Sequence, residues 1–116
     1  MTYRTARRTL AALVCVGMIS GCATPEEKAL AKDRVALMGA QAKMADEHKN
    51  CSELTGAIMD WEKANADKIK DVNTRWQALS KSKRNSLLKP HKSESNQYFK
   101  AMIGPLVRCG TVWPVK

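Results

Sequence analysis

Hydrophobic positions recur at helical spacing through most of this chain. The first stripe, with steps of three and four residues, consists of Ala31, Val35, Met38, Ala42 and Ala45. This pattern predicts an amphipathic helix over 25–49. Thr24 is suited to cap its start, with Pro25 in the first turn and Glu27 completing a capping box.

A second stripe follows with the same spacing and one polar interruption. Its members are Leu54, Ile58, Trp61, Asn65, Ile69, Val72, Trp76 and Leu79. The pattern predicts a second amphipathic helix over 51–79. Its two tryptophans lie on one face, where we expect them to anchor the core.

The sequence allows these two segments to be either one continuous helix or two separate helices. A heptad step runs unbroken from Leu30 to Leu79, and neither Gly nor Pro interrupts 46–55. One helix over 25–79 would be about 80 Å long. Asn50 is suited to cap a new helix, and the apolar stripe narrows at 48–50. These two features favour a break near 49–52.

The next segment predicts a short helix. Ser80 is suited to cap it, and Leu87 and Leu88 supply its apolar side. Pro90 disfavours helical backbone at the residue before it, so the helix should end or kink there.

A last helix is predicted near 93–108, and the tail 110–116 has no periodicity. The inward positions expected of this helix are Phe99, Met102, Ile103 and Leu106. Within the tail, Trp113 should pack over the core as a lid.

The first 21 residues have the pattern of an export signal. Residues 1–9 contain three arginines and no acid, and residues 10–19 form an apolar run. That run is too short to span a bilayer as a helix, which requires about 20 apolar residues. We therefore expect 1–21 to be a cleaved signal peptide outside the fold.

Ile19-Ser20-Gly21-Cys22 resembles the lipobox of bacterial lipoproteins. The resemblance implies a lipid on the Cys22 thiol and a mature chain beginning with a lipidated segment, 22–24. Ala23 replaces the Asp that often retains such proteins at the inner membrane. We expect a lipid anchor in the cell envelope, at the periplasmic face of the outer membrane.

Two further cysteines, Cys51 and Cys109, remain in the mature chain. In an oxidising compartment a disulfide between them is the default expectation. If the chain folds back at Ser80, the arms 51–79 and 81–109 are equally long, so their far ends meet. The expected fold is all-α: a small three- to four-helix bundle over 25–109, stapled by one disulfide.

Charge divides the mature chain into two unequal parts. The 116-residue sequence has a net charge of +9; residues 22–74 hold 8 basic and 10 acidic side chains, and residues 75–116 hold 9 basic and 1 acidic. The basic positions of 75–92 are Arg75, Lys81, Lys83, Arg84, Lys89 and Lys92. They either form a solvated face or bind an anionic partner: lipid head groups, the cell wall or an acidic protein. No nucleic-acid fold signature is present, so we expect no nucleic-acid partner.

The sequence offers little catalytic chemistry. His48 and His91 have no accompanying nucleophile and orienting group, and short Ser-x-x-Lys patterns occur at Ser80 and Ser86 without room for the fold that would use them. Together with Cys51 and Cys109, the two histidines could supply four zinc ligands. However, the expected chain path places His91 at the end of the bundle opposite to Cys51. We expect no enzyme, no metal site, and no cofactor besides the lipid on Cys22.

Three classes of function remain. The first is a binding or adaptor lipoprotein for envelope assembly, loosely similar to the small helical pilotins of secretion systems. The second is an immunity, inhibitor or exclusion lipoprotein. The third is a structural lipoprotein similar to the murein lipoprotein, which is joined to the cell wall through a terminal Lys such as Lys116. The residues before Lys116 do not match that family, and we favour the first class.

Overall fold

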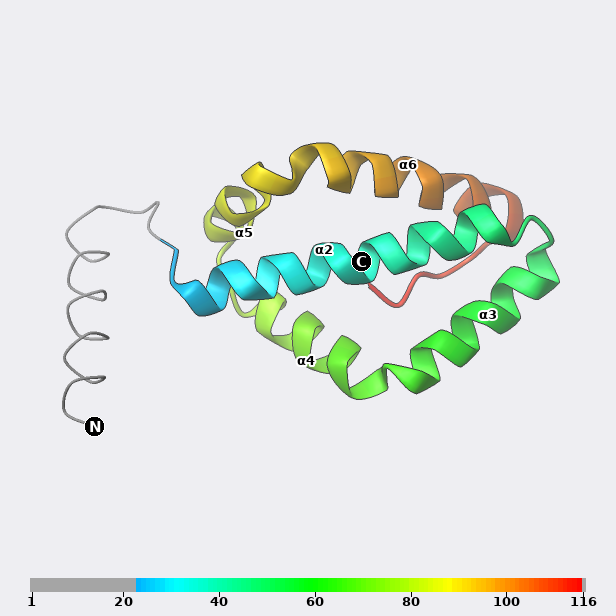
Figure 1. Ribbon diagram of the computed structural model, residues 1–116, viewed down its shortest axis with the longest axis horizontal. Coiled ribbons are helices and arrows are strands. Elements are labelled where there is room, and N and C mark those ends of the chain that lie inside the picture. The colour runs from blue at the N-terminus through cyan, green and yellow to red at the C-terminus, as the bar shows by residue number, and fades with distance from the viewer. Residues whose placement is uncertain (1–22, 116) are drawn as a thin grey trace.

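Residues 23–115 form an all-α bundle around one long central helix (Figure 1). The computed structural model describes these residues; the lipobox Ile19–Cys22, the signal segment and Lys116 lie outside them. The elements are α2 (Pro25–Glu47), α3 (Cys51–Ala64), α4 (Ala66–Gln77), α5 (Lys81–Leu88), the 3-10 turn η1 (Lys89–His91) and α6 (Lys92–Cys109). Residues 23–115 contain no strand. The predicted fold class, a small helical bundle, is confirmed.

Helix α2 begins and ends at signals that the sequence contains. Thr24 and Glu27 form the predicted capping box, each side chain accepting a hydrogen bond from the other's backbone N–H. Beyond Glu47 the chain turns, and the Asn50 side chain accepts from the N–H groups of Ser52 and Glu53 at 2.9 and 3.2 Å. The predicted break is therefore confirmed, and 25–79 is not a single helix.

The second predicted helix is itself divided at Asn65. Helix α3 ends at Ala64 and α4 begins at Ala66, and the Asn65 side-chain amide donates to the Trp61 carbonyl at 2.8 Å. Asn competes for backbone hydrogen bonds in this way and so disfavours helix interiors. Helices α3 and α4 form an angled arm whose corner lies away from α2, and α4 returns to pack against α2 (Figure 1). The expectation of one uninterrupted helix over 51–79 is wrong at this residue.

The C-terminal tail is part of the core. Gly110 ends α6 in the left-handed conformation, at φ 64°, which favours glycine. The chain then turns back and ends beside the middle of α2 (Figure 1), where Val115 is fully buried. Trp113 is also buried, and its indole N–H donates to the Met102 carbonyl at 3.0 Å.

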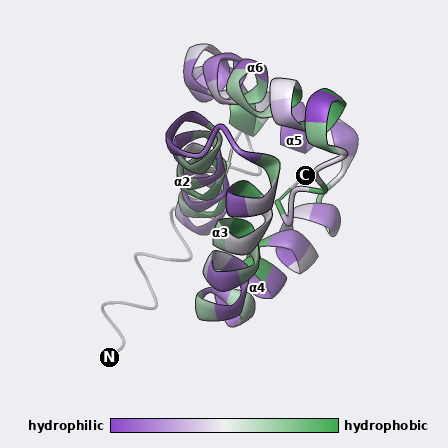
Figure 2. Cartoon of the chain, turned by 90° about the vertical axis from the view of Figure 1, so that its right-hand side faces the viewer, coloured by the Kyte–Doolittle hydropathy of each residue, from purple (hydrophilic) through white to green (hydrophobic). Residues whose placement is uncertain are grey.

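Two hydrophobic clusters make up the core. One groups residues of α2, α4 and α5 with Val115, and the other groups α2, α3 and α6 with Trp113. Tyr98 packs against both clusters and lies over Gly39 of α2. Viewed from the end where α2 meets α3, hydrophobic and hydrophilic segments alternate along the helices (Figure 2), as amphipathic packing requires.

Helix α6 faces the core with a different stripe from the one predicted. Among the four positions expected inward, Met102 is buried, whereas Phe99, Ile103 and Leu106 are exposed. The helix instead packs through Met102 and Pro105, with Tyr98 half-buried beside them. In this rotation the Tyr98 ring lies against Gly39 of α2, where a Cβ would come within 3.1–3.3 Å of the ring atoms, so the absence of a side chain at Gly39 eases the close packing of the two helices.

A disulfide closes the end of the bundle where α2 meets α3. It joins Cys51, at the start of α3, to Cys109, at the end of α6, with 5.5 Å between their Cα atoms. The two arms that flank Ser80 therefore meet at their far ends, as expected. No helix within 23–115 has the length and apolar character to cross a membrane.

Candidate functional site: the cationic end of the bundle

The basic segment of the sequence lies at the same end of the bundle as the first described residue. Ala23 packs against the hydrophobic core, and α5 lies beside the start of α2 (Figure 1). The Lys83 ammonium lies 2.9 Å from a Glu27 carboxylate oxygen, an ion pair across 56 positions of sequence. We call this region, formed by the first turns of α2, by α5, by η1 and by the start of α6, the cationic end.

Local sequence explains why the chain turns at this point. The Ser80 hydroxyl accepts from the Lys83 N–H and begins α5, as predicted. Leu87 is buried in the core, so α5 is fastened to the bundle along one side. Helix α5 ends at Leu88, as expected, but Lys89 keeps helical backbone angles (φ −50°, ψ −49°) although it precedes Pro90, and the 3-10 turn η1 then leads into α6. The polar side of this turn is left facing outward.

The six basic residues singled out from the sequence have three different environments. Lys83 is paired with Glu27, and Arg75 is paired with Asp71 at 3.3 Å on the exposed side of α4. Arg84 is half-buried in a cleft beside Trp76. The remaining three are exposed, namely Lys81, Lys89 and Lys92. The segment is therefore partly structural, and these three lysines are its outward charges.

Two further lysines join this end, and the sequence analysis missed them. Lys28 and Lys32 of α2 are exposed and line a cleft of about 480 Å³ together with Ala23, Pro90 and His91. The spacing of four residues places both on one face of α2. That spacing could be seen in the sequence, but the two lysines join the basic segment only because α5 packs beside α2.

Interactions within the cationic end stabilise the ionised form of Glu27. Burial alone would raise the pKa of its carboxyl, but hydrogen bonds from Thr24 and Lys83 and the Lys83 charge outweigh it, so the pKa lies below its ordinary value of 4.5. Glu27 is therefore ionised at neutral pH and neutralises Lys83. His91 lies 3.7 Å from Glu94, the acidic residue of the first turn of α6.

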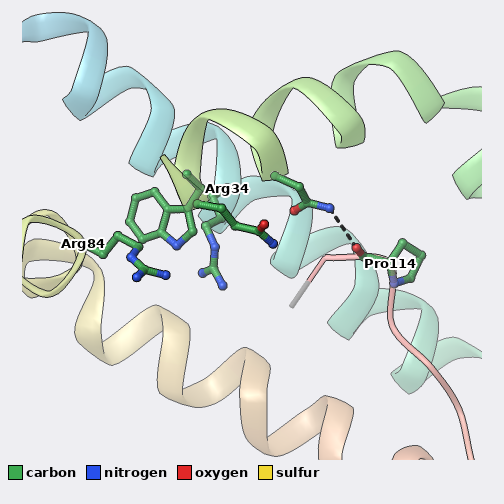
Figure 3. Close-up of a pocket in the computed structure, with 6 residues that line it drawn as sticks. Arg34, Arg84 and Pro114 are labelled. Carbon is green, nitrogen blue, oxygen red and sulfur yellow. Dashed lines mark hydrogen bonds between the residues drawn. The ribbon is translucent and has the colours of Figure 1, made fainter. Parts of the chain in front are cut away.

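A second cleft, of about 400 Å³, lies between α2, α4 and α5 (Figure 3). Arg34 stacks on the Trp76 ring, with its guanidinium carbon 5.0 Å from the ring centroid, and Arg84 lines the same cleft. Asn73 lines it too and donates to the Pro114 carbonyl at 3.1 Å, which ties the tail to α4.

Two guanidinium groups line this cleft, and the charge of Arg84 acts on Arg34. Burial lowers the pKa of Arg34, and the neighbouring Arg84 charge lowers it further. Stacking on Trp76 compensates in part, since a cation over an aromatic face is attracted by the ring.

The residues of the possible zinc site lie at opposite ends of the structure. Cys51 and Cys109 are bonded to each other, while His91 lies at the opposite end of α2, a helix about 35 Å long. The four residues of the possible zinc site are therefore not brought together. Within 23–115, no cluster of three His, Cys, Asp or Glu side chains could hold a metal ion.

Comparison of the chain with family models, curated proteins and solved structures gives no match. What can be inferred about function therefore rests on the residues and their arrangement.

Proposed function

We propose that this protein is a lipid-anchored lipoprotein of the bacterial envelope that acts by binding, as an adaptor, with its cationic end against an anionic membrane surface. The lipobox Ile19–Cys22 supports the anchor. Ala23 alone separates Cys22 from the Thr24 cap of α2, and Ala23 packs against the core. A lipid on Cys22 would therefore hold this end of the bundle close to the bilayer. The periplasmic face of the outer membrane is the proposed location.

The observation that carries the proposal is the ion pair between Lys83 and Glu27. It fixes α5 beside the first turn of α2, so the anchor position and the basic segment share one end. The exposed charged side chains at that end are five lysines, Lys28, Lys32, Lys81, Lys89 and Lys92, against two acids, Glu26 and Glu94. Each lysine near an anionic leaflet contributes on the order of 1 kcal/mol to binding.

An anchor and a basic surface complement each other physically. The lipid that the lipobox implies is a diacylglycerol, whose two acyl chains already give stable attachment, so the basic surface would add contact with the head groups rather than the anchoring itself. The charges also orient the bundle, because turning the cationic end away from the leaflet would lose their attraction. The long axis of the bundle would then point away from the membrane, and the surfaces along its helices would be accessible to protein partners.

The anchor is tested by metabolic labelling with palmitate followed by membrane fractionation. We expect the full chain to take up label and to sediment with membranes, and Cys22→Ser to lose both properties. Label on the Cys22→Ser chain, or an unlabelled wild type in the soluble fraction, would overturn the anchor.

The orientation is tested by photo-cross-linking in cells from position 89, with position 59 as the matched control. Lys89 lies at the cationic end, and Met59 is an exposed residue of α3. We expect phospholipid adducts from position 89 and none from position 59. Equal lipid adducts from both positions would contradict an end-on orientation.

A further inference from the structure

Helix α6 carries an apolar stripe that the rest of the described chain leaves uncovered. Phe99, Ile103, Leu106 and Val107 are 55%, 41%, 45% and 81% exposed. Steps of four and three residues place the first three on one face, and Val107 lies one turn beyond Ile103. We call these four residues the α6 stripe.

The spacing of this stripe is that of a helix face made for packing. The same pattern in α2 and α4 is buried in the core, but α6 presents Met102 and Pro105 to the core instead. Isolated exposed apolar residues are ordinary on protein surfaces, whereas a row of large ones on one helix face marks an interaction site. The stripe therefore has the features of a surface with a partner.

We propose that the α6 stripe is the docking site for an amphipathic helix of another envelope protein, a helix whose apolar face is bordered by acidic residues. This inference rests on the proposed adaptor function and names the chemistry of its partner. Helix-to-helix docking of this kind reads apolar anchors at spacings of three and four residues. The stripe supplies such anchors over two turns of α6.

Basic side chains beside the α6 stripe are the reason to expect acidic residues on the partner helix. Lys92 continues the stripe two turns before Phe99, and Lys100 lies one turn before Ile103. Glu94 is the single acid in residues 75–116, and it lies 3.7 Å from His91. Opposite charges along the edges of two docked helices steer the encounter and fix the register.

The alternative occupants of the stripe fit less well. A second copy of this chain would place Lys92 and Lys100 against the same basic surface, which is repulsive. With the cationic end on the bilayer, the stripe begins about 10 Å along α6 from that end and continues to about 22 Å. It then lies on a side wall above the head groups, where a protein helix can reach it.

The test is photo-cross-linking in cells from position 103 of the full-length, membrane-anchored chain, with the cross-linked peptide sequenced. Position 68 of α4, also exposed, is the control. We expect one protein adduct from 103 and none from 68, with the adduct in a partner segment of helical apolar spacing bordered by Asp or Glu. Lys100→Glu should lower its yield at least tenfold, and Lys70→Glu, an equal charge change on α4, should leave it unchanged.

Four outcomes would overturn the inference: no adduct from 103, adducts to lipid alone, an adduct to a second copy, or an adduct whose yield ignores Lys100→Glu. The lipid outcome would mean that α6 lies on the bilayer. Palmitate labelling and the adducts from position 89 are read separately. Loss of the α6 adduct with those results intact refutes the partner helix, and their loss refutes the membrane anchor.

Discussion

The side chain of Gln41 and the backbone of Val115 form a reciprocal pair of hydrogen bonds across the centre of the bundle. The Val115 N–H donates to Gln41 Oε1 at 2.8 Å, and Gln41 Nε2 donates to the Val115 carbonyl at 3.0 Å. Both residues are fully buried and 74 positions apart. One amide thus satisfies a stretch of tail backbone that has no helix or strand to pair with.

Replacing Gln41 by Leu should destabilise the protein strongly. The size is kept, but a donor and an acceptor of Val115 are left buried without partners, at about 1–3 kcal/mol for each group. We expect the free energy of unfolding to fall by about 3 kcal/mol, measured by chemical denaturation. Lys43→Ala, on the exposed side of α2, is the control and should change stability little. A Gln41→Leu variant as stable as the wild type would show that the tail does not hold the core together.

Local interactions explain why much of the fold could be predicted from the sequence. The caps at Thr24, Asn50 and Ser80 are hydrogen bonds to residues two or three positions away, so the helix starts follow from neighbouring residues. The long stripe of α2 is likewise buried as predicted. The cysteines paired as expected because equal arms around Ser80 bring their ends together.

Of the features that were not predicted, the break at Asn65 is local, and the others are set by contacts between distant segments. Asn65 fits the spacing of its stripe, so its break shows only in its own hydrogen bond to Trp61. The outward position of Ile103 depends on how α6 packs on α2, where Tyr98 lies against Gly39. The candidate site could be predicted only in part. The basic residues of 75–92 are visible in the sequence as a run of charge, while the lysines of α2 join them only through the packing of α5 beside α2.

The contact between Gly39 and Tyr98 predicts opposite effects for two glycine substitutions. A Cβ on Gly39 would lie 3.1 Å from the Tyr98 ring, whereas a Cβ on Gly56 would meet nothing within 4 Å. Overpacking costs about 1–3 kcal/mol, and Ala gains about 1 kcal/mol over Gly in a helix. Gly39→Ala should therefore lower the free energy of unfolding by up to about 2 kcal/mol, and Gly56→Ala should raise it by about 1 kcal/mol.

A double-mutant cycle isolates the cause of this difference. In a Tyr98→Leu background the ring is gone, so Gly39→Ala should become neutral or stabilising. Denaturation curves of the four proteins give the coupling between the two sites. Additive effects of the two substitutions would mean that the ring does not set the packing of α6 on α2.

The disulfide should stabilise the bundle through the loop that it closes. Cys51 and Cys109 are 58 positions apart, and the chain-entropy model gives about 4 kcal/mol for a loop of that size. We expect the Cys51→Ala, Cys109→Ala double variant to lose about that much free energy of unfolding, and reductant to have the same effect on the wild type. Reductant should leave the double variant unchanged; any further loss there would show that its effect on the wild type does not come from this bond.

The ion pair at the cationic end predicts an acid-dependent contribution to stability. Because the pKa of Glu27 in the folded state lies below its ordinary value of 4.5, its ionised form favours folding. That contribution is fully present above pH 4.5 and is lost as the pH falls through the lower, folded-state pKa. Glu27→Gln should therefore be less stable than the wild type at pH 7, and the difference should shrink below pH 4.5. Denaturation curves from pH 7 to pH 3 measure it, with Glu26→Gln, an exposed neighbour, as the control. A difference that stays constant down to pH 3 would mean that the Glu27 charge does not fasten α5 to α2.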